Sequence, residues 1–221
     1  MAPEKFEAIL ATHPSAEDPA SLFAVVYASV WDQVKTEVFA LNLPYSQLNF
    51  PHEGGVTAFF SRNMTPEDLK LVSQFLKHAK LEAWNTRAFK TGEGAYTVTV
   101  GSISEDLSRE EKFQDCTFNL KYGEFAPYLK ECVHYLEKAV KYAADENQQK
   151  MIELYIEFFQ TGQISVHKDA QRRWIADKGP VIEMNMGWIE TYIDPENIRG
   201  DFEGWVAVVN KARSEKFNKL V

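Results

Sequence analysis

The chain has 221 residues, of which 45% are hydrophobic, so it is long enough to bury one core and to begin a second lobe. Its 32 acidic side chains outnumber its 24 basic ones and give a formal charge of −8, which repels phosphate backbones and predicts no nucleic-acid partner. No run approaches 18 apolar residues and no apolar stretch follows the first residues, so neither membrane insertion nor secretion is expected.

The first fifty residues are predicted to be mainly helical. A short helix is expected over residues 3–11. Asp18 can cap a second helix with Pro19 at its first position, because a side-chain acceptor and an early proline both suit a helix start. The apolar residues of that helix recur at helical spacing and would form one buried face: Leu22, Phe23, Val26, Val30, Val34, Val38 and Leu41.

A small β-core is predicted in the middle of the chain. Residues 56–60 and 113–122 are expected to be strands, and residues 82–90 and 95–103 to be the arms of a hairpin around a Gly-rich turn. Residues 104–112 are acidic and polar and are interpreted as a surface loop. With one further strand near the C-terminus, this gives a mixed or antiparallel, barrel-like core of about five strands.

Several α-helices are expected to pack on this core, so the predicted fold class is α+β. Thr65 followed by Pro66 has the pattern of a helix start. The remaining helices are predicted over residues 125–143, from Asp145 to Gly162, from Ser165 to Gly179, and through a last stretch with Trp205, Val208, Val209, Ala212, Phe217 and Leu220 in phase.

The stretch from Gly179 to Pro195 has the clearest strand pattern. Apolar residues stand at the even positions Ile182, Met184, Met186 and Trp188. Glu183 and Asn185 stand at odd positions, which is the period of a half-buried strand. The phase reverses past Gly187, which predicts a bulge or a close backbone approach. A carboxylate and an amide are therefore expected on one face, and the simplest interpretation is a solvated face.

Many spaced residues around this strand carry a family resemblance. They include His167-Lys168, Trp174, the run DKGPVIE that ends at Glu183, and RGDFEGWVAVVNK from Arg199 to Lys211. Upstream, Ala83-Trp84-Asn85-Thr86-Arg87 and Lys121-Tyr122-Gly123-Glu124-Phe125-Ala126-Pro127 add to it. The chain resembles the dipeptidyl peptidase III family of zinc exopeptidases, over most of its length and most densely from Thr161 to Val221.

The resemblance implies a function in binding oligopeptides, from which the complete enzyme would release N-terminal dipeptides. In the family the peptide pairs as an added strand, and the Glu of the GPxxE motif, here Glu183, holds its free α-ammonium. The substrate-binding residues implied are Glu183, Asn185, Met184 and Gly187. Many members have Tyr where this chain has Asn185, so an aromatic contact with the first residue of the peptide would be lost.

No catalytic or metal-binding residue is expected in the chain itself. The family's zinc motifs, HExxGH and EExRAE, do not occur, and His52-Glu53-Gly54-Gly55 is interpreted as a turn because paired glycines break a helix. The five histidines, His13, His52, His78, His134 and His167, lack ligand spacing. Zinc is therefore expected as a cofactor of the complete enzyme only, and the chain alone is expected to bind no zinc and to be inactive.

By this resemblance, residues 1–221 form one substrate-binding lobe. Its parts would be an N-terminal helical part (1–50), the β-core with helices (51–195) and the start of the connection to the catalytic lobe (196–221). The last helix has no stop signal, which suggests a piece of a longer polypeptide. Cys116 and Cys132 are too few for a disulfide framework, so free thiols in the cytoplasm are expected.

Two alternatives stay open at this point. The first is a non-catalytic peptide-binding or interaction module. The second is a non-peptidase relative on the same scaffold, similar to the fungal proteins of the family described as aflatoxin-converting oxidases.

Overall fold

The computed structural model describes residues 3–12, 22–40 and 48–219, without the side chains of residues 22–29. The chain divides into two compact units, and each is described by itself: Met1–Leu48 with Gly54–Val56, and Asn49–Glu53 with Thr57–Val221. The predicted cap at Asp18 and Pro19 lies outside the described residues. So do Leu41 and Leu220, and the side chains of Leu22, Phe23 and Val26. The single-lobe organisation stays a prediction.

The first unit contains helices α1 (Pro3–Ala11) and α2 (Leu22–Val38). Phe6 packs against Trp31 with ring centroids 5.5 Å apart, and the Trp31 indole Nε1 donates to Glu7 Oε1 at 3.0 Å. Three members of the predicted apolar face, Val30, Val34 and Val38, are exposed by 40%, 37% and 54%. The two helices therefore meet through aromatic rings rather than through the valine face.

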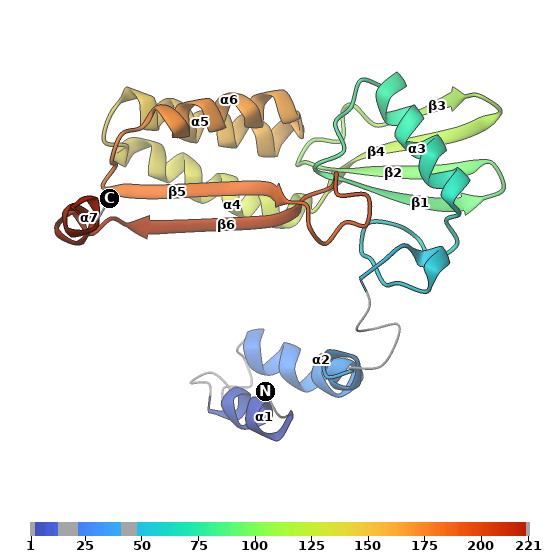
Figure 1. Cartoon of the computed structure of the whole chain (residues 1–221), viewed down its shortest axis with the longest axis horizontal. Coiled ribbons are helices and arrows are strands. Elements are labelled where there is room, and N and C mark those ends of the chain that lie inside the picture. The colour runs from blue at the N-terminus through green and yellow to red at the C-terminus, as the bar shows by residue number, and fades with distance from the viewer. Residues whose placement is uncertain (1–2, 13–21, 41–47, 220–221) are drawn as a thin grey trace. The chain divides into compact units, whose positions relative to one another are not determined.

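A four-stranded sheet and helix α3 form the first core of the second unit (Figure 1). The strands are β1 (Thr86–Gly92), β2 (Ala95–Gly101), β3 (Arg109–Phe113) and β4 (Cys116–Glu124), in the order β1-β2-β4-β3. β2 and β4 are parallel, and the outer pairs are antiparallel. Helix α3 (Pro66–His78) begins with the expected capping box, and its Phe75 stacks on Phe118 with centroids 4.0 Å apart.

Two predictions for this region are wrong. The loop expected over residues 104–112 contains the start of β3, whose charged side chains lie at the sheet edge and give no apolar alternation. Residues 56–60 do not form a strand: Phe60 makes a single bridge to Ala88 after the 3-10 turn Pro51–Glu53.

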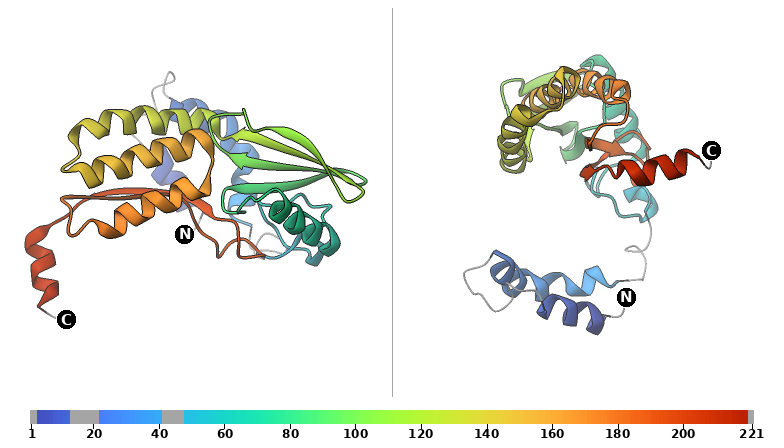
Figure 2. Two further views of the ribbon diagram at one scale, coloured as in Figure 1. Left: turned by 90° about the horizontal axis from the view of Figure 1, so that it is seen from above. Right: turned by 90° about the vertical axis from the view of Figure 1, so that its left-hand side faces the viewer.

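The second core lies between three helices and a two-stranded sheet. The helices are α4 (Ala126–Ala139), α5 (Glu146–Thr161) and α6 (Ile164–Ala176), and a 3-10 turn, η2 (Val140–Tyr142), follows α4. The strands are β5 (Ile182–Glu190) and β6 (Asp201–Val208), paired antiparallel. Figure 2 shows the helices side by side as one layer over the hairpin. Asp145 and Gly162 cap α5 as predicted.

Three further expectations are corrected here. The last helix was expected to carry Trp205 and Val208, but both belong to β6, and α7 (Lys211–Asn218) begins only after them. Ser165 lies inside α6, whose N-cap is Gln163. The α+β class is confirmed, but the described strands form two open sheets and no barrel.

Across the described residues, no helix is long and apolar enough to cross a membrane.

Candidate functional site

Strand β5 and helix α6 run in opposite directions and contact each other at three matched positions. Glu183 meets Trp174, Asn185 meets Gln171, and Gly187 meets His167. The strand residues are alternate, so they share one face. The helix residues are spaced by three and four, so they also share one face. The predicted common face of Glu183 and Asn185 is therefore present, but it packs on α6 instead of facing solvent.

The Glu183 carboxylate is partly exposed and is oriented by one hydrogen bond. Its Oε1 accepts from Nε1 of Trp174 on the last turn of α6. Asp177 lies near it: burial raises the pKa of Asp177, the charges of Asp145 and Glu183 raise it further, and Lys211 lowers it.

Asn185 is buried, with only 7% of its surface exposed. Its Oδ1 accepts from Nε2 of Gln171 at 3.1 Å and from the hydroxyl of Tyr155 at 3.3 Å, and its Nδ2 donates to Oε1 of Gln171 at 3.1 Å. Burial raises the pKa of Tyr155 to about 12, so this hydroxyl stays protonated. The amide is thus occupied by the protein's own side chains.

Gly187 allows the closest approach between the strand and the helix. Its φ is +146°, and a Cβ placed there would lie 2.8 Å from Cε1 of His167. The predicted kink therefore has a steric reason, since the imidazole occupies the space that a side chain would need.

Met184 lies on the opposite face of β5, toward α4 and α5. It is 5% exposed and lines an apolar cavity of about 520 Å³ together with Ile182, Met186, Val206 and Tyr135. The four residues predicted for substrate binding therefore divide into two sets: Glu183, Asn185 and Gly187 face α6, and Met184 faces this cavity.

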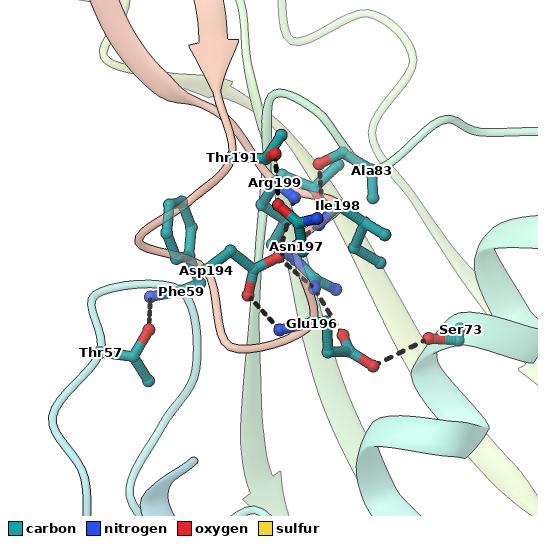
Figure 3. Close-up of polar contacts among 11 residues, drawn as sticks. Thr57, Phe59, Ser73, Ala83, Thr191, Asp194, Glu196, Asn197, Ile198 and Arg199 are labelled. Carbon is teal, nitrogen blue, oxygen red and sulfur yellow. Dashed lines mark hydrogen bonds and ion pairs between the residues drawn. The ribbon is translucent and has the colours of Figure 1, made fainter. Parts of the chain in front are cut away.

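The connection between β5 and β6 is held by a buried polar cluster that the sequence pattern did not reveal (Figure 3). Asp194 accepts hydrogen bonds from the backbone N–H groups of Glu196, Ile198 and Arg199 at 3.1, 3.1 and 2.8 Å. The Arg199 side chain is fully buried. Its Nη1 donates to Oε2 of Glu196 at 2.7 Å, and its Cζ lies 4.5 Å from the ring centroid of Phe60.

These contacts fix the hairpin to the first core. Ser73 of α3 donates to Glu196 at 3.4 Å, and the N–H of Gly200 donates to the carbonyl of Trp84 at 2.8 Å. The Asp-Pro pair that begins this loop could have predicted a side-chain-closed turn, because Asp commonly accepts from the backbone N–H two residues later.

The part of the chain that the structure describes contains no cluster of side chains that could bind a metal ion. A zinc site needs three or four His, Cys, Asp or Glu side chains around one point, and no such group occurs among these residues.

Known proteins resemble the chain along most of its length. A family model described as Peptidase family M49 matches residues 30–221. The chain is 43% identical over 206 residues to dipeptidyl peptidase 3 of Homo sapiens and 36% identical over 191 residues to that of Dictyostelium discoideum. These alignments cover 87% and 86% of this chain, but the chain spans only 28% of the length of either relative.

Solved structures agree in fold. The structure of DPP III from Caldithrix abyssi matches with a TM-score of 0.53 at 18% identity, covering 89% of this chain and 37% of that one. Dipeptidyl-peptidase III from Corallococcus sp. strain EGB matches with a TM-score of 0.50 at 17% identity, covering 74% of this chain and 27% of that one. Since the family model covers far more than half of the residues, the chain belongs to peptidase family M49.

Proposed function

We propose that this chain is the substrate-binding part of a zinc exopeptidase that releases dipeptides from the N-termini of oligopeptides. Glu183 is the anchor for the free α-ammonium of the peptide, and Asn185, Met184 and Gly187 shape the strand on which the peptide lies. The catalytic lobe and its zinc belong to the remaining polypeptide, and this chain alone does not hydrolyse peptides. A cytoplasmic location is part of the proposal and is supported by the two free thiols, Cys116 and Cys132.

The observation that carries the proposal is the state of Glu183. Its carboxylate is only partly buried and, among the described residues, accepts a hydrogen bond from one donor, the indole N–H of Trp174. A carboxylate has about four acceptor positions, so one donor leaves capacity for an ammonium ion. An ammonium at the end of a strand-like peptide occurs only at its N-terminus, so this contact would set the point of cleavage.

The test is Glu183→Gln in the complete enzyme. The amide keeps the shape but loses the charge, and a hydrogen bond to a charged group is worth about 1.5–3 kcal/mol, so kcat/KM for free-amine peptides should fall about ten- to a hundredfold. Glu190→Gln is the matched control, because it makes the same chemical change at the other end of β5 and should have a smaller effect.

Peptides with an acetylated N-terminus show whether Glu183 binds the α-ammonium or only supports the structure. They carry no ammonium, so they should bind poorly to the wild type and be nearly indifferent to Glu183→Gln. Equal losses for free and acetylated peptides, or unchanged turnover of free peptides, would show that Glu183 is not the anchor.

A further inference from the structure

A second cavity, of about 450 Å³, lies where the four-stranded sheet, helix α4 and the start of β6 meet. Its walls are mostly aromatic and apolar, formed by Phe59, Phe125, Tyr128, Leu129, Trp188 and Phe202. Of the residues named for peptide binding, it contains none. Trp188 is its only contribution from β5, near the end of the strand that is opposite to Glu183. Its size is that of a small-molecule site.

Two of the aromatic side chains that line this cavity, Trp188 and Phe125, contact other parts of the protein closely. Trp188 is 6% exposed and lies so close over Gly101 that a Cβ there would be 2.4 Å from its Cζ2 atom. Phe125 has a φ of +63°, which is unfavourable for a bulky residue, and the Arg87 guanidinium lies 5.4 Å from its ring centroid. Trp188 is therefore positioned by its packing on Gly101, and the Phe125 ring by the guanidinium of Arg87.

The charges around the cavity favour a cation. Arg87 is neutralised by Glu124, whose Oε1 accepts from Arg87 Nε at 2.7 Å and whose Oε2 accepts from Thr99 at 2.6 Å. Asp201 also lines the cavity, and its carboxylate forms no ion pair with another residue that the structure describes. Because Arg87 is paired with Glu124, Asp201 leaves a net negative charge on the cavity walls.

We propose that this cavity binds an organic ammonium ion carried on an aromatic or bulky apolar body, such as an arylalkylamine. The apolar walls would cover the body of the ligand, and the ammonium would meet Asp201 within reach of aromatic faces, which attract cations. The same chemistry is present in a free amine and in the N-terminal aromatic residue of a peptide. The proposal does not depend on the role of Glu183.

Titration calorimetry on the purified protein tests the ligand class with three phenylalkyl compounds that differ in the charge of their end group: positive, neutral and negative. 2-Phenylethylamine should bind about tenfold more tightly than the neutral 2-phenylethanol, and the anionic 3-phenylpropionate should not bind. Dipeptides that begin with phenylalanine then separate the two sources of the ligand. Binding of the dipeptide with a free N-terminus, but not of its acetylated form, would show that the cavity accepts a peptide, whereas binding of 2-phenylethylamine alone would restrict the ligand to free amines. Absence of heat with millimolar amine, or equal affinity for amine and carboxylate, overturns the proposal.

Two variants with a matched control locate the site. Asp201→Asn should reduce the affinity for the amine about tenfold, to that of the alcohol. Glu203→Gln makes the same change of charge on β6 outside the cavity and should leave the affinity nearly unchanged. Tyr128→Ala should weaken amine and alcohol alike, and Tyr128 is 75% exposed, so this change spares the fold. Equal effects of the two charge variants would overturn the assignment.

The two free cysteines give a second readout. Cys132 lines this cavity and also the cavity beside Met184, whereas Cys116 lines neither. Bound 2-phenylethylamine should slow alkylation of Cys132, measured by peptide mass spectrometry, and leave that of Cys116 unchanged, and Asp201→Asn should remove this protection, because Asp201 lines only the first of the two cavities. An equal rate at Cys132 with and without saturating amine would contradict occupancy of this cavity.

Discussion

His167 illustrates how one buried titratable residue can set the acid sensitivity of the fold. Its side chain is buried, with 1% of the residue exposed. The centroid of the imidazole ring lies 4.8 Å from that of Phe158 and 6.0 Å from that of Trp84. Its Nδ1 has no hydrogen-bond partner among the described residues. Burial lowers its pKa from 6.5 to about 4. The folded state therefore holds the neutral ring.

This shift predicts a loss of stability in weak acid. Above the ordinary pKa of 6.5, both folded and unfolded chains carry a neutral ring and the residue has no effect. As the pH falls toward 4, the unfolded chain takes up a proton that the folded chain does not, so the free energy of unfolding decreases by up to about 3 kcal/mol. Urea unfolding of the wild type and of His167→Leu at several pH values measures the difference.

His167→Leu should lose the part of the wild-type pH dependence that lies between pH 6.5 and 4. Parallel pH dependences for His167→Leu and the wild type would show that the imidazole does not report on folding.

At the scale of elements, the contact between α6 and β5 depends on the absence of a side chain at Gly187. Gly187→Ala would place a methyl group 2.8 Å from the His167 ring at a φ of +146°, so both sterics and backbone conformation oppose it. We expect the free energy of unfolding to fall by about 2 kcal/mol or more. Gly204→Ala is the control on the paired strand, where the new Cβ would meet Met186 Cβ at an ordinary 3.5 Å. Similar losses in the two variants would contradict this account.

The elements that the sequence predicted correctly are those with local signals. The Thr65–Asp68 capping box and the Asp145 and Gly162 caps are hydrogen-bonding patterns within a few residues, so they do not depend on distant parts of the chain. Strand β5 was predicted from its alternation and its glycine. The common face of Glu183 and Asn185 followed from the same alternation, but its burial by α6 did not, because the partner helix cannot be identified from the strand pattern alone.

The elements that were missed depend on a distant partner. Trp205 and Val208 fit a helical period, but they pair with Asn185 and Ile182 of β5 and therefore lie in a strand. Strand β3 is formed by charged residues that pair with β4 at the sheet edge. Arg199 gave no signal, because the contact of its side chain with Phe60 forms only when the loop folds against the first core.

At the scale of the whole molecule, β6 exposes apolar residues on both of its faces. Phe202, Trp205, Val206 and Val208 are exposed by 45%, 40%, 64% and 77%, and β6 pairs only with β5 among the described strands. A strand with one free edge and apolar faces favours association with another surface. We expect the chain to bind an apolar fluorescent dye more strongly than an ordinary compact monomer does.

Charged substitutions test this expectation. Val206→Lys with Val208→Lys should reduce the dye fluorescence. Val38→Lys introduces a lysine at a residue of α2 that is exposed by 54% and belongs to the other compact unit, and it should not reduce the fluorescence. Dye binding at the level of an ordinary monomer, together with a sharp thermal transition, would contradict the exposure of this patch.

The matched contacts between α6 and β5 also determine where the chain can change in length. From His167 to Trp174 a helix advances about 10.5 Å, and from Gly187 to Glu183 a strand advances about 13 Å, so the two spacings nearly agree. One residue added inside α6 would rotate every later side chain by about 100°, and one added inside β5 would turn Glu183 to the opposite face. Insertions in related chains should therefore be absent from the helix and from the strand.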